Sequence, residues 1–154
     1  SAASDVYKRQ VHDEASAFFG GLAGNAGLFS TARDVARVYQ MLLNGGEIDG
    51  QRYLSKETCQ LFTTETSKIS RRGLGFDKPD ADDPKKGNCA PAAPAEVYGH
   101  TGFTGTCAWV DPMNELVYVF LSNRIYPDVT NRKLNQLHIR ERIQGAIYDA
   151  MKKK

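Results

Sequence analysis

The chain has 154 residues, a formal net charge of +2 and 41% hydrophobic residues. This length is enough for one domain with a hydrophobic core, and the composition excludes an intrinsically disordered chain. The small charge does not favour nucleic acid as a partner, and no apolar segment approaches the roughly 18 residues that cross a bilayer, so no membrane span is expected.

Two stretches near the start differ in character. Residues 1–10 show no periodicity and are interpreted as a leader unrelated to the fold, and no signal peptide is visible. The glycine-rich stretch 18–30 lacks the Lys-Ser/Thr of a phosphate-binding loop, and no clear strand precedes it, so nucleotide binding is a minor alternative. We expect instead a compact loop that packs Leu22, Leu28 and Phe29 into a core.

The next stretch predicts two helices. Ser30 or Thr31 can cap the first, which has a wide apolar face and ends at Gly45-Gly46. A turn over 48–53 leads to a shorter helix from about Ser55 to Phe62. The apolar face of the first helix consists of Val35, Val38, Tyr39, Met41, Leu42 and Leu43.

The segment 67–95 is predicted to be mostly irregular, with 73–76 as a candidate short strand. Between 80 and 94 it contains three prolines and many small residues. This composition is typical of a surface loop, and we interpret its charges as solvated.

Neither the cysteines nor the histidines are spaced as metal ligands, so no metal or cofactor is expected. Cys59, Cys89 and Cys107 lack C-x-x-C spacing and are interpreted as unpaired small hydrophobic residues, with one disulfide plus a free thiol as the alternative. His138 is expected to be half-exposed on a helix. His12 is interpreted as a structural anchor, with a role in the site as the alternative.

The C-terminal third predicts a hairpin and a helix. Strands are expected at 107–110 and 116–121, joined by a turn at 111–114, and a helix at about 131–152. The helix has apolar residues at helical spacing: Ile139, Ile143, Ala146, Ile147, Ala150 and Met151. A lone hairpin is marginally stable, so we interpret the chain as an α/β (α+β) domain that is incomplete.

The run Y-G-H-T-G-F-T-G-T at 98–106 is the most informative motif. It precedes the first strand of the hairpin and is expected on a sheet edge. Gly102 and Gly105 remove side chains where a ligand could approach the backbone. Such a strand can hydrogen-bond a substrate and polarise its carbonyl group.

This run resembles the His/Lys-Thr-Gly strand of serine β-lactamases and penicillin-binding proteins. From Val11 to about Lys152 the chain is similar to class C members of that family. The closest match is the domain fused to bacterial family 3 glycoside hydrolases (β-N-acetylglucosaminidase-like). The motifs that carry the resemblance are the 21–46 run, R-R-G-L-G-F-D-K-P, L-S-N-R-I-Y-P and I-Q-G-A-I-Y-D-A.

The resemblance implies a fold and a set of site residues. The fold is the C-terminal part of the β-lactamase/transpeptidase-like fold, an antiparallel sheet packed by helices that include the C-terminal one. His100 takes the Lys/His position and Thr101 the hydroxyl that contacts the substrate carboxylate. Gly102 keeps the strand open, and the N–H of Phe103 is one oxyanion-hole donor. Further substrate-binding candidates are Tyr98, Thr104, Asn123 and Arg132.

The chain departs from the family pattern in three places. Ser-x-x-Lys and Tyr-x-Asn are absent and would lie upstream of Val11. Asn25 replaces the histidine of the family's Gly-His-Ala-Gly-Leu-Phe-Ser. After Tyr126-Pro127 the chain reads Asp-Val-Thr-Asn-Arg, whereas class C enzymes tend to show Asn-x-x-Arg.

The expected function is therefore that of a fragment of a serine hydrolase that forms an acyl-enzyme on D-Ala peptides, β-lactams or esters. Lacking the nucleophile, residues 1–154 are expected to be inactive alone. The implied partners are the missing N-terminal half of the domain and a small peptide, ester or muropeptide substrate, in a periplasmic or exported location. The alternative is a non-catalytic peptidoglycan- or glycan-binding module.

Overall fold

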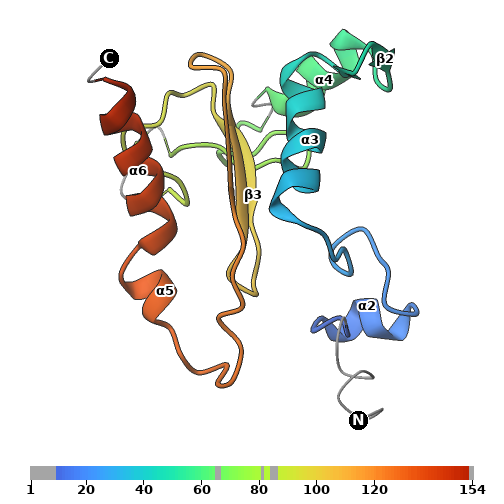
Figure 1. Cartoon of the computed structure of the whole chain (residues 1–154), viewed down its shortest axis with the longest axis vertical. Coiled ribbons are helices and arrows are strands. Elements are labelled where there is room, and N and C mark those ends of the chain that lie inside the picture. Colours follow the sequence, from blue (N-terminus) through green and yellow to red (C-terminus); the bar gives the residue numbers. More distant parts are fainter. Residues whose placement is uncertain (1–9, 65–66, 81, 84–86, 153–154) are drawn as a thin grey trace. The chain divides into compact units, whose positions relative to one another are not determined.

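A computed structural model describes residues 10–64, 67–80, 82–83 and 87–152. Except for Gln10, the leader expected at 1–10 lies outside these residues. The chain divides into two compact units, Ser1–Thr31 and Ala32–Lys154. Figure 1 shows their elements.

The first unit contains the short helix α2 (Glu14–Phe18) and the glycine-rich loop. The Asp13 carboxylate caps α2 by accepting the N–H of Ser16 at 2.7 Å. Asn25 ties the loop to this cap, since its Nδ2 donates to Asp13 and its Oδ1 accepts from the Ser16 hydroxyl, both at 3.1 Å. A residue that breaks the family pattern thus holds the loop on the helix cap.

The prediction that this loop packs its apolar side chains into a core is wrong for this chain. Leu22, Leu28 and Phe29 are 76%, 84% and 51% exposed. Among the described residues of the unit only Ser16 is buried. The loop is held instead by the polar contacts of Asn25 with Asp13 and Ser16.

The second unit is built on a three-stranded antiparallel sheet with the order β3-β4-β5. Its strands are Tyr98–Thr101, Cys107–Asp111 and Leu116–Phe120, which confirms the predicted hairpin. The register pairs Gly99 with Trp109 and Trp109 with Tyr118. The Asp111 carboxylate closes the β4–β5 turn by accepting the N–H groups of Met113 and Asn114.

The predicted helices before the sheet are confirmed. Helix α3 (Ala32–Leu43) contacts β4 and β5. Gly45 and Gly46, both at positive φ, follow its end. The expected turn is a small hairpin of β1 (Glu47–Ile48) and β2 (Gln51–Arg52). Helix α4 (Lys56–Thr63) is capped by Ser55.

The segment between α4 and β3 is irregular, as predicted, but residues 73–76 form no strand. Among its described residues, Asp77 pairs with the sheet in an isolated bridge to Gly99. The stretch 80–94 is more than a solvated loop, because Cys89 and Ala90 are each 2% exposed. The N–H of Ala90 donates to the Gln144 side chain at 2.8 Å, which anchors this part of the loop to the last helix.

The prediction of one continuous C-terminal helix at 131–152 is wrong. The structure has α5 (Lys133–Gln136) and α6 (Ile139–Met151), interrupted at exposed His138, which has a left-handed φ of 49°. The break lets the Arg140 guanidinium reach both the Asn135 side chain and the Thr106 carbonyl, each at 3.1 Å. A straight helix would forgo these contacts.

The buried face of α6 is polar, contrary to the apolar face that its spacing predicts. Its buried residues are Arg140, Gln144 and Tyr148, whereas Ile143 and Met151 are each 38% exposed. The three polar side chains each meet a partner on the facing segments, as the Tyr148 hydroxyl does by donating to Asp111 at 2.8 Å. Such pairing offsets the cost of burying polar groups.

The sheet lies between α3 on one face and α6 on the other (Figure 1). The hydrophobic core contains Cys89, Val97, Cys107, Trp109 and Tyr118, with Ile147 of α6 against it. All three cysteines are free and buried, as predicted. In the described part of the chain, no helix is both long and apolar enough to cross a membrane.

We predict that Tyr148→Phe lowers the free energy of unfolding by about 1–3 kcal/mol, because it removes a hydrogen bond to a buried carboxylate. Tyr53→Phe is the matched control, since its hydroxyl bonds Gln51 on the exposed surface. Urea unfolding of both variants measures the effect. Equal losses for the two variants would contradict a special contribution of the Tyr148–Asp111 bond.

Candidate active-site strand

Strand β3 lies at the edge of the sheet, as the motif predicts. One side of it pairs with β4. On the other side Gly99 and Asp77 exchange both main-chain hydrogen bonds, at 2.7 and 3.0 Å. Main-chain groups alternate in direction along a strand, so those of Thr101 face the same edge, beyond the point that Asp77 covers.

Packing within the chain explains why glycine occupies three positions of the motif, a reason that the sequence did not predict. A Cβ on Gly99 would lie 2.1 Å from the carbonyl oxygen of Ala108, and one on Gly102 would lie 2.3 Å from Thr106 Oγ1. Gly105 has a φ of +109°, and its Cβ would lie 2.5 Å from the Ser122 hydroxyl. At these positions this chain's own atoms fill the space that a side chain would need.

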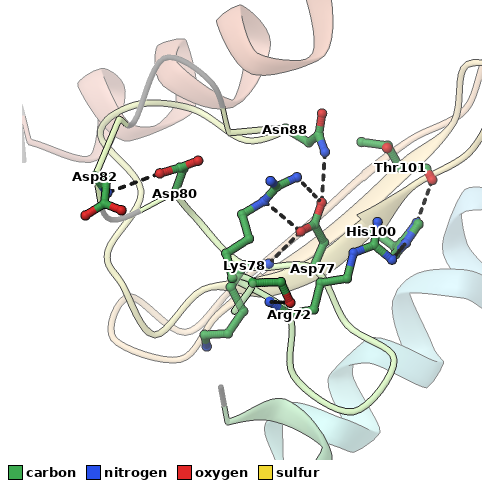
Figure 2. A network of polar contacts seen from close by, with 10 residues as sticks. Arg72, Asp77, Lys78, Asp80, Asp82, Asn88, His100 and Thr101 are labelled. Carbon is green, nitrogen blue, oxygen red and sulfur yellow. Dashed lines mark hydrogen bonds and ion pairs between the residues drawn. The ribbon is translucent and has the colours of Figure 1, made fainter. Parts of the chain in front are cut away.

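His100 is held by contacts at both ring nitrogens. Nδ1 lies 2.6 Å from the carbonyl oxygen of Thr101, and Nε2 lies 3.3 Å from a guanidinium nitrogen of Arg72. Figure 2 shows these residues together at the end of β3. Sequence reasoning found His100 but not Arg72, which lies 28 residues earlier in an irregular segment.

A buried carboxylate holds that irregular segment on the strand (Figure 2). Asp77 is fully buried, and it accepts hydrogen bonds from Arg71 at 3.1 Å and from Asn88 at 2.8 Å. Arg71 Nε also lies 2.9 Å from the second carboxylate oxygen. Burial raises the pKa of Asp77, but the bonds from Asn88 and Arg71 outweigh it and leave the pKa below its ordinary value.

The turn after β3 is clamped by Arg124, another residue to which the sequence assigned no role. Its Nε donates to the Phe103 carbonyl at 2.6 Å, and its backbone N–H donates to the Thr104 carbonyl at 2.8 Å. The guanidinium carbon lies 4.4 Å from the centroid of the Phe103 ring. Its place in L-S-N-R-I-Y-P, directly after β5, was the available signal.

The remaining candidates lie in two other places. Tyr98 is buried with its ring edge against Phe76, and burial raises the pKa of its hydroxyl. Asn123 lines an open groove of about 300 Å³, and Arg132 lies between two residues of the groove lining. The groove is lined by Ser122, Asn123, Arg124, Tyr126, Asn131, Lys133, Leu134, Leu137 and Ile139.

The structure thus brings His100, Thr101, Gly102, Phe103 and Thr104 together at one end of the sheet edge. Asn123 lines the neighbouring groove, and Arg132 is not part of the lining but lies in sequence between two residues that are, Asn131 and Lys133. The Arg124 clamp joins the two places, since this residue both lines the groove and holds Phe103. Among the described residues no group of three or more His, Cys, Asp or Glu side chains could hold a metal ion.

We predict that Gly99→Ala destabilises the fold by about 2 kcal/mol or more, because the new methyl group meets backbone atoms of β4. Gly102→Ala is the matched control, since its methyl group meets a Thr106 side chain that can rotate. Urea unfolding compares the two. A larger loss for Gly102→Ala would contradict the packing account of this strand.

We predict that Asp77→Asn costs about 3 kcal/mol at neutral pH, because it leaves Arg71 without its buried partner. The lowered pKa of Asp77 means that its ionised form stabilises the fold above the ordinary value of 3.8 and that this stability is lost as pH falls through the folded value. The wild type should therefore lose stability more steeply than Asp77→Asn below about pH 4.

Chemical unfolding between about pH 2 and pH 7 measures this difference. Asp82→Asn is the control for the loss of one carboxylate, because its side chain is exposed on the loop. Parallel curves for the wild type and Asp77→Asn would contradict the assigned role of Asp77.

Comparison with known proteins bears on this site. A family model described as "Beta-lactamase" matches residues 2–141. A protein named "Putative D-alanyl-D-alanine carboxypeptidase" from Escherichia coli O157:H7 is 38% identical over 128 residues, which are 82% of this chain and 29% of that protein. One of the same name from Salmonella agona is 36% identical over 127 residues, again 82% and 29%.

The chain therefore spans less than a third of the length of these relatives. Among solved structures, a penicillin-binding protein homologue from Caulobacter crescentus is similar at 26% identity and a TM-score of 0.49, over 61% of this chain and 26% of that one. The family match covers most of the residues and includes the whole of β3 and the turn that Arg124 clamps. This chain belongs to the β-lactamase family.

Proposed function

We propose that this chain is the part of a serine hydrolase that carries one side of its oxyanion hole and the third-motif strand. This strand is the His/Lys-Thr-Gly strand, which follows Ser-x-x-Lys and Tyr-x-Asn as the third catalytic motif of the family. The observation that carries the proposal is the placement of His100, Thr101, Gly102 and Phe103 at one end of an edge strand. Membership of the β-lactamase family supports it. A serine supplied from upstream would attack an amide or ester carbonyl at this edge and form an acyl-enzyme.

The oxyanion donor that we propose from the resemblance is the N–H of Phe103. It lies in the turn after β3, which is closed by hydrogen bonds from the N–H of Gly102 to the Thr106 carbonyl at 2.8 Å and from the N–H of Gly105 to the Gly102 carbonyl at 3.0 Å. Arg124 holds the Phe103 carbonyl in place, so the same peptide segment is preorganised for this task.

The substrate class that we propose is a peptide ending in D-alanine, with β-lactams and small esters as alternatives. The relatives whose name includes D-alanyl-D-alanine carboxypeptidase support this choice. A terminal carboxylate would contact the Thr101 hydroxyl at the strand. The further candidates to bind it are Asn123, which lines the groove with Arg124, and Arg132, which lies in sequence between two lining residues.

The other parts of the proposal rest on the resemblance. The partner is the N-terminal half of the same domain, which would supply Ser-x-x-Lys and Tyr-x-Asn. We also propose the class C type, fusion to a family 3 glycoside hydrolase and a periplasmic or exported location. Without the upstream serine this chain would not perform acyl transfer.

The second candidate function is a non-catalytic module that binds peptidoglycan peptides or glycans. The observation that favours it is the strand edge with the neighbouring groove, which could hold such a ligand without cleaving it. The reading frame upstream of Val11 separates the two functions. Intact Ser-x-x-Lys and Tyr-x-Asn there favour the hydrolase, and a lost serine favours the binding module.

We predict that a fluorescent penicillin labels a full-length protein containing this chain and an upstream Ser-x-x-Lys, but does not label residues 1–154. In that protein Thr101→Val should lower kcat/KM for a D-Ala-D-Ala peptide roughly 10- to 100-fold, because it removes a hydrogen bond to a charged group. Thr58→Val, on helix α4, is the control. A stable acyl adduct on the 154-residue chain, or an unchanged rate for Thr101→Val, would contradict the proposal.

A further inference from the structure

We propose that Arg72 is a positioning residue that fixes His100 in its neutral, Nδ1-protonated form, and that Arg72 is itself the permanent positive charge beside the third-motif strand. The part that concerns substrate rests on the function proposed above. The part that concerns the imidazole ring stands on geometry alone.

The two contacts of the ring determine its tautomer. A carbonyl oxygen can only accept a hydrogen bond, so the 2.6 Å contact with Thr101 requires the proton on Nδ1. A guanidinium can only donate, so the 3.3 Å contact with Arg72 requires a bare lone pair on Nε2. A doubly protonated ring would turn an N–H of His100 toward the N–H groups of Arg72.

Arg72 is held at this point by its neighbour in sequence. Arg71 forms the ion pair with buried Asp77, and Asp77 is bonded to β3 through Gly99. The two consecutive arginines therefore have different partners. Arg71 is paired with the Asp77 carboxylate. Arg72 contacts the ring of His100 (Figure 2). Arg72 is exposed, so its guanidinium can also meet a ligand.

The charges near His100 are predominantly positive. Arg71, Arg72 and Lys78 are cationic, and Asp77 carries a negative charge that pairs with Arg71, while the Nζ of Lys78 donates to the carbonyls of Thr63 and Glu96. Asp77 is the carboxylate that the charge of Arg72 also influences. The other titratable groups on the neighbouring elements, Tyr98, Tyr39 and Cys107, stay neutral because burial raises their pKa.

This assignment changes what the motif means for the substrate. A histidine in place of the family's lysine implies a grip on a carboxylate that weakens as the imidazole loses its proton. With the permanently charged Arg72 beside the ring, the positive charge at the strand does not depend on a proton on His100. The ring then contributes a hydrogen-bonding surface of defined polarity, and the arginine contributes the charge.

The first test measures the tautomer in the full 154-residue chain at about pH 8, where an ordinary imidazole is neutral. Nitrogen-15 NMR of the ring, assigned by the loss of its signals in His100→Gln, should show a protonated Nδ1 and a bare Nε2. Arg72→Lys, which retains a charged donor, should keep this pattern, and Arg72→Met should give a mixture of tautomers. Arg142→Met removes the same charge from α6 and should change nothing.

A wild-type ring with its proton on Nε2 would overturn the proposal. A ring that stays fully Nδ1-protonated in Arg72→Met would also overturn it, because the Thr101 carbonyl alone would then fix the tautomer. Urea unfolding of Arg72→Met shows whether the variant is folded, and Arg72→Lys provides the same test if it is not.

The second test compares binding of acetyl-D-alanine with that of its neutral amide, followed by the backbone amide signals of Thr101 and Phe103. In the wild type the carboxylate should bind about 3- to 10-fold more tightly, by the same factor at about pH 6 and about pH 8. The preference should disappear in Arg72→Met and persist in Arg72→Lys. A preference lost at the higher pH in the wild type would overturn the proposal, because His100 would then supply the charge.

The two tests separate this inference from the proposed function. If neither compound shifts the amide signals while the ring is Nδ1-protonated in the wild type and a mixture of tautomers in Arg72→Met, the substrate part is refuted for this chain and the positioning part is confirmed. The proposed function is decided independently by penicillin labelling and by the Thr101→Val rates.

Discussion

The buried carboxylate of Asp77 is the constraint on which the site depends. The main chain of Asp77 exchanges two hydrogen bonds with Gly99 at the edge of β3, and the Asp77 side chain binds Arg71 and Asn88 from the irregular segment. Those partners come from either side of Asp77 in sequence, so a stretch without helix or strand is held at two points. The strand edge beyond Gly99 stays outside this pairing. Asp77 therefore positions the motif residues 100–104 without covering them itself.

A second set of buried polar contacts holds helix α6 against one face of the sheet. Helix α6 buries Arg140, Gln144 and Tyr148, which bond Thr106, Ala90 and Asp111. These bonds connect the helix to the start of β4, to the loop and to the end of β4. Hydrogen bonds of this kind specify one arrangement of helix and sheet, since a shifted helix would leave buried polar groups unpaired. The break at His138 belongs to the same set, because it gives Arg140 its reach.

The predictions from sequence were most accurate where the pattern was local. Helices α3 and α4, the hairpin and the edge position of β3 follow from periodicity, capping and turn residues that lie within a few positions of one another. The predictions were wrong where the burial of a side chain depends on contacts with residues far away in sequence. The polar face of α6 contradicts its apolar spacing, and Leu22, Leu28 and Phe29 remain exposed although their sequence favours burial.

The candidate site divides in the same way. Residues 98–106 determined by themselves that a strand with a glycine-containing turn carries His100 and Thr101, because those features are encoded in consecutive positions. Only the tertiary structure decided that Arg72 meets His100 and that Arg124 clamps Phe103. Side chains that lie 28 and 21 residues apart in sequence become neighbours only when the buried pair at Asp77 and the strand order of the sheet fix the backbone between them.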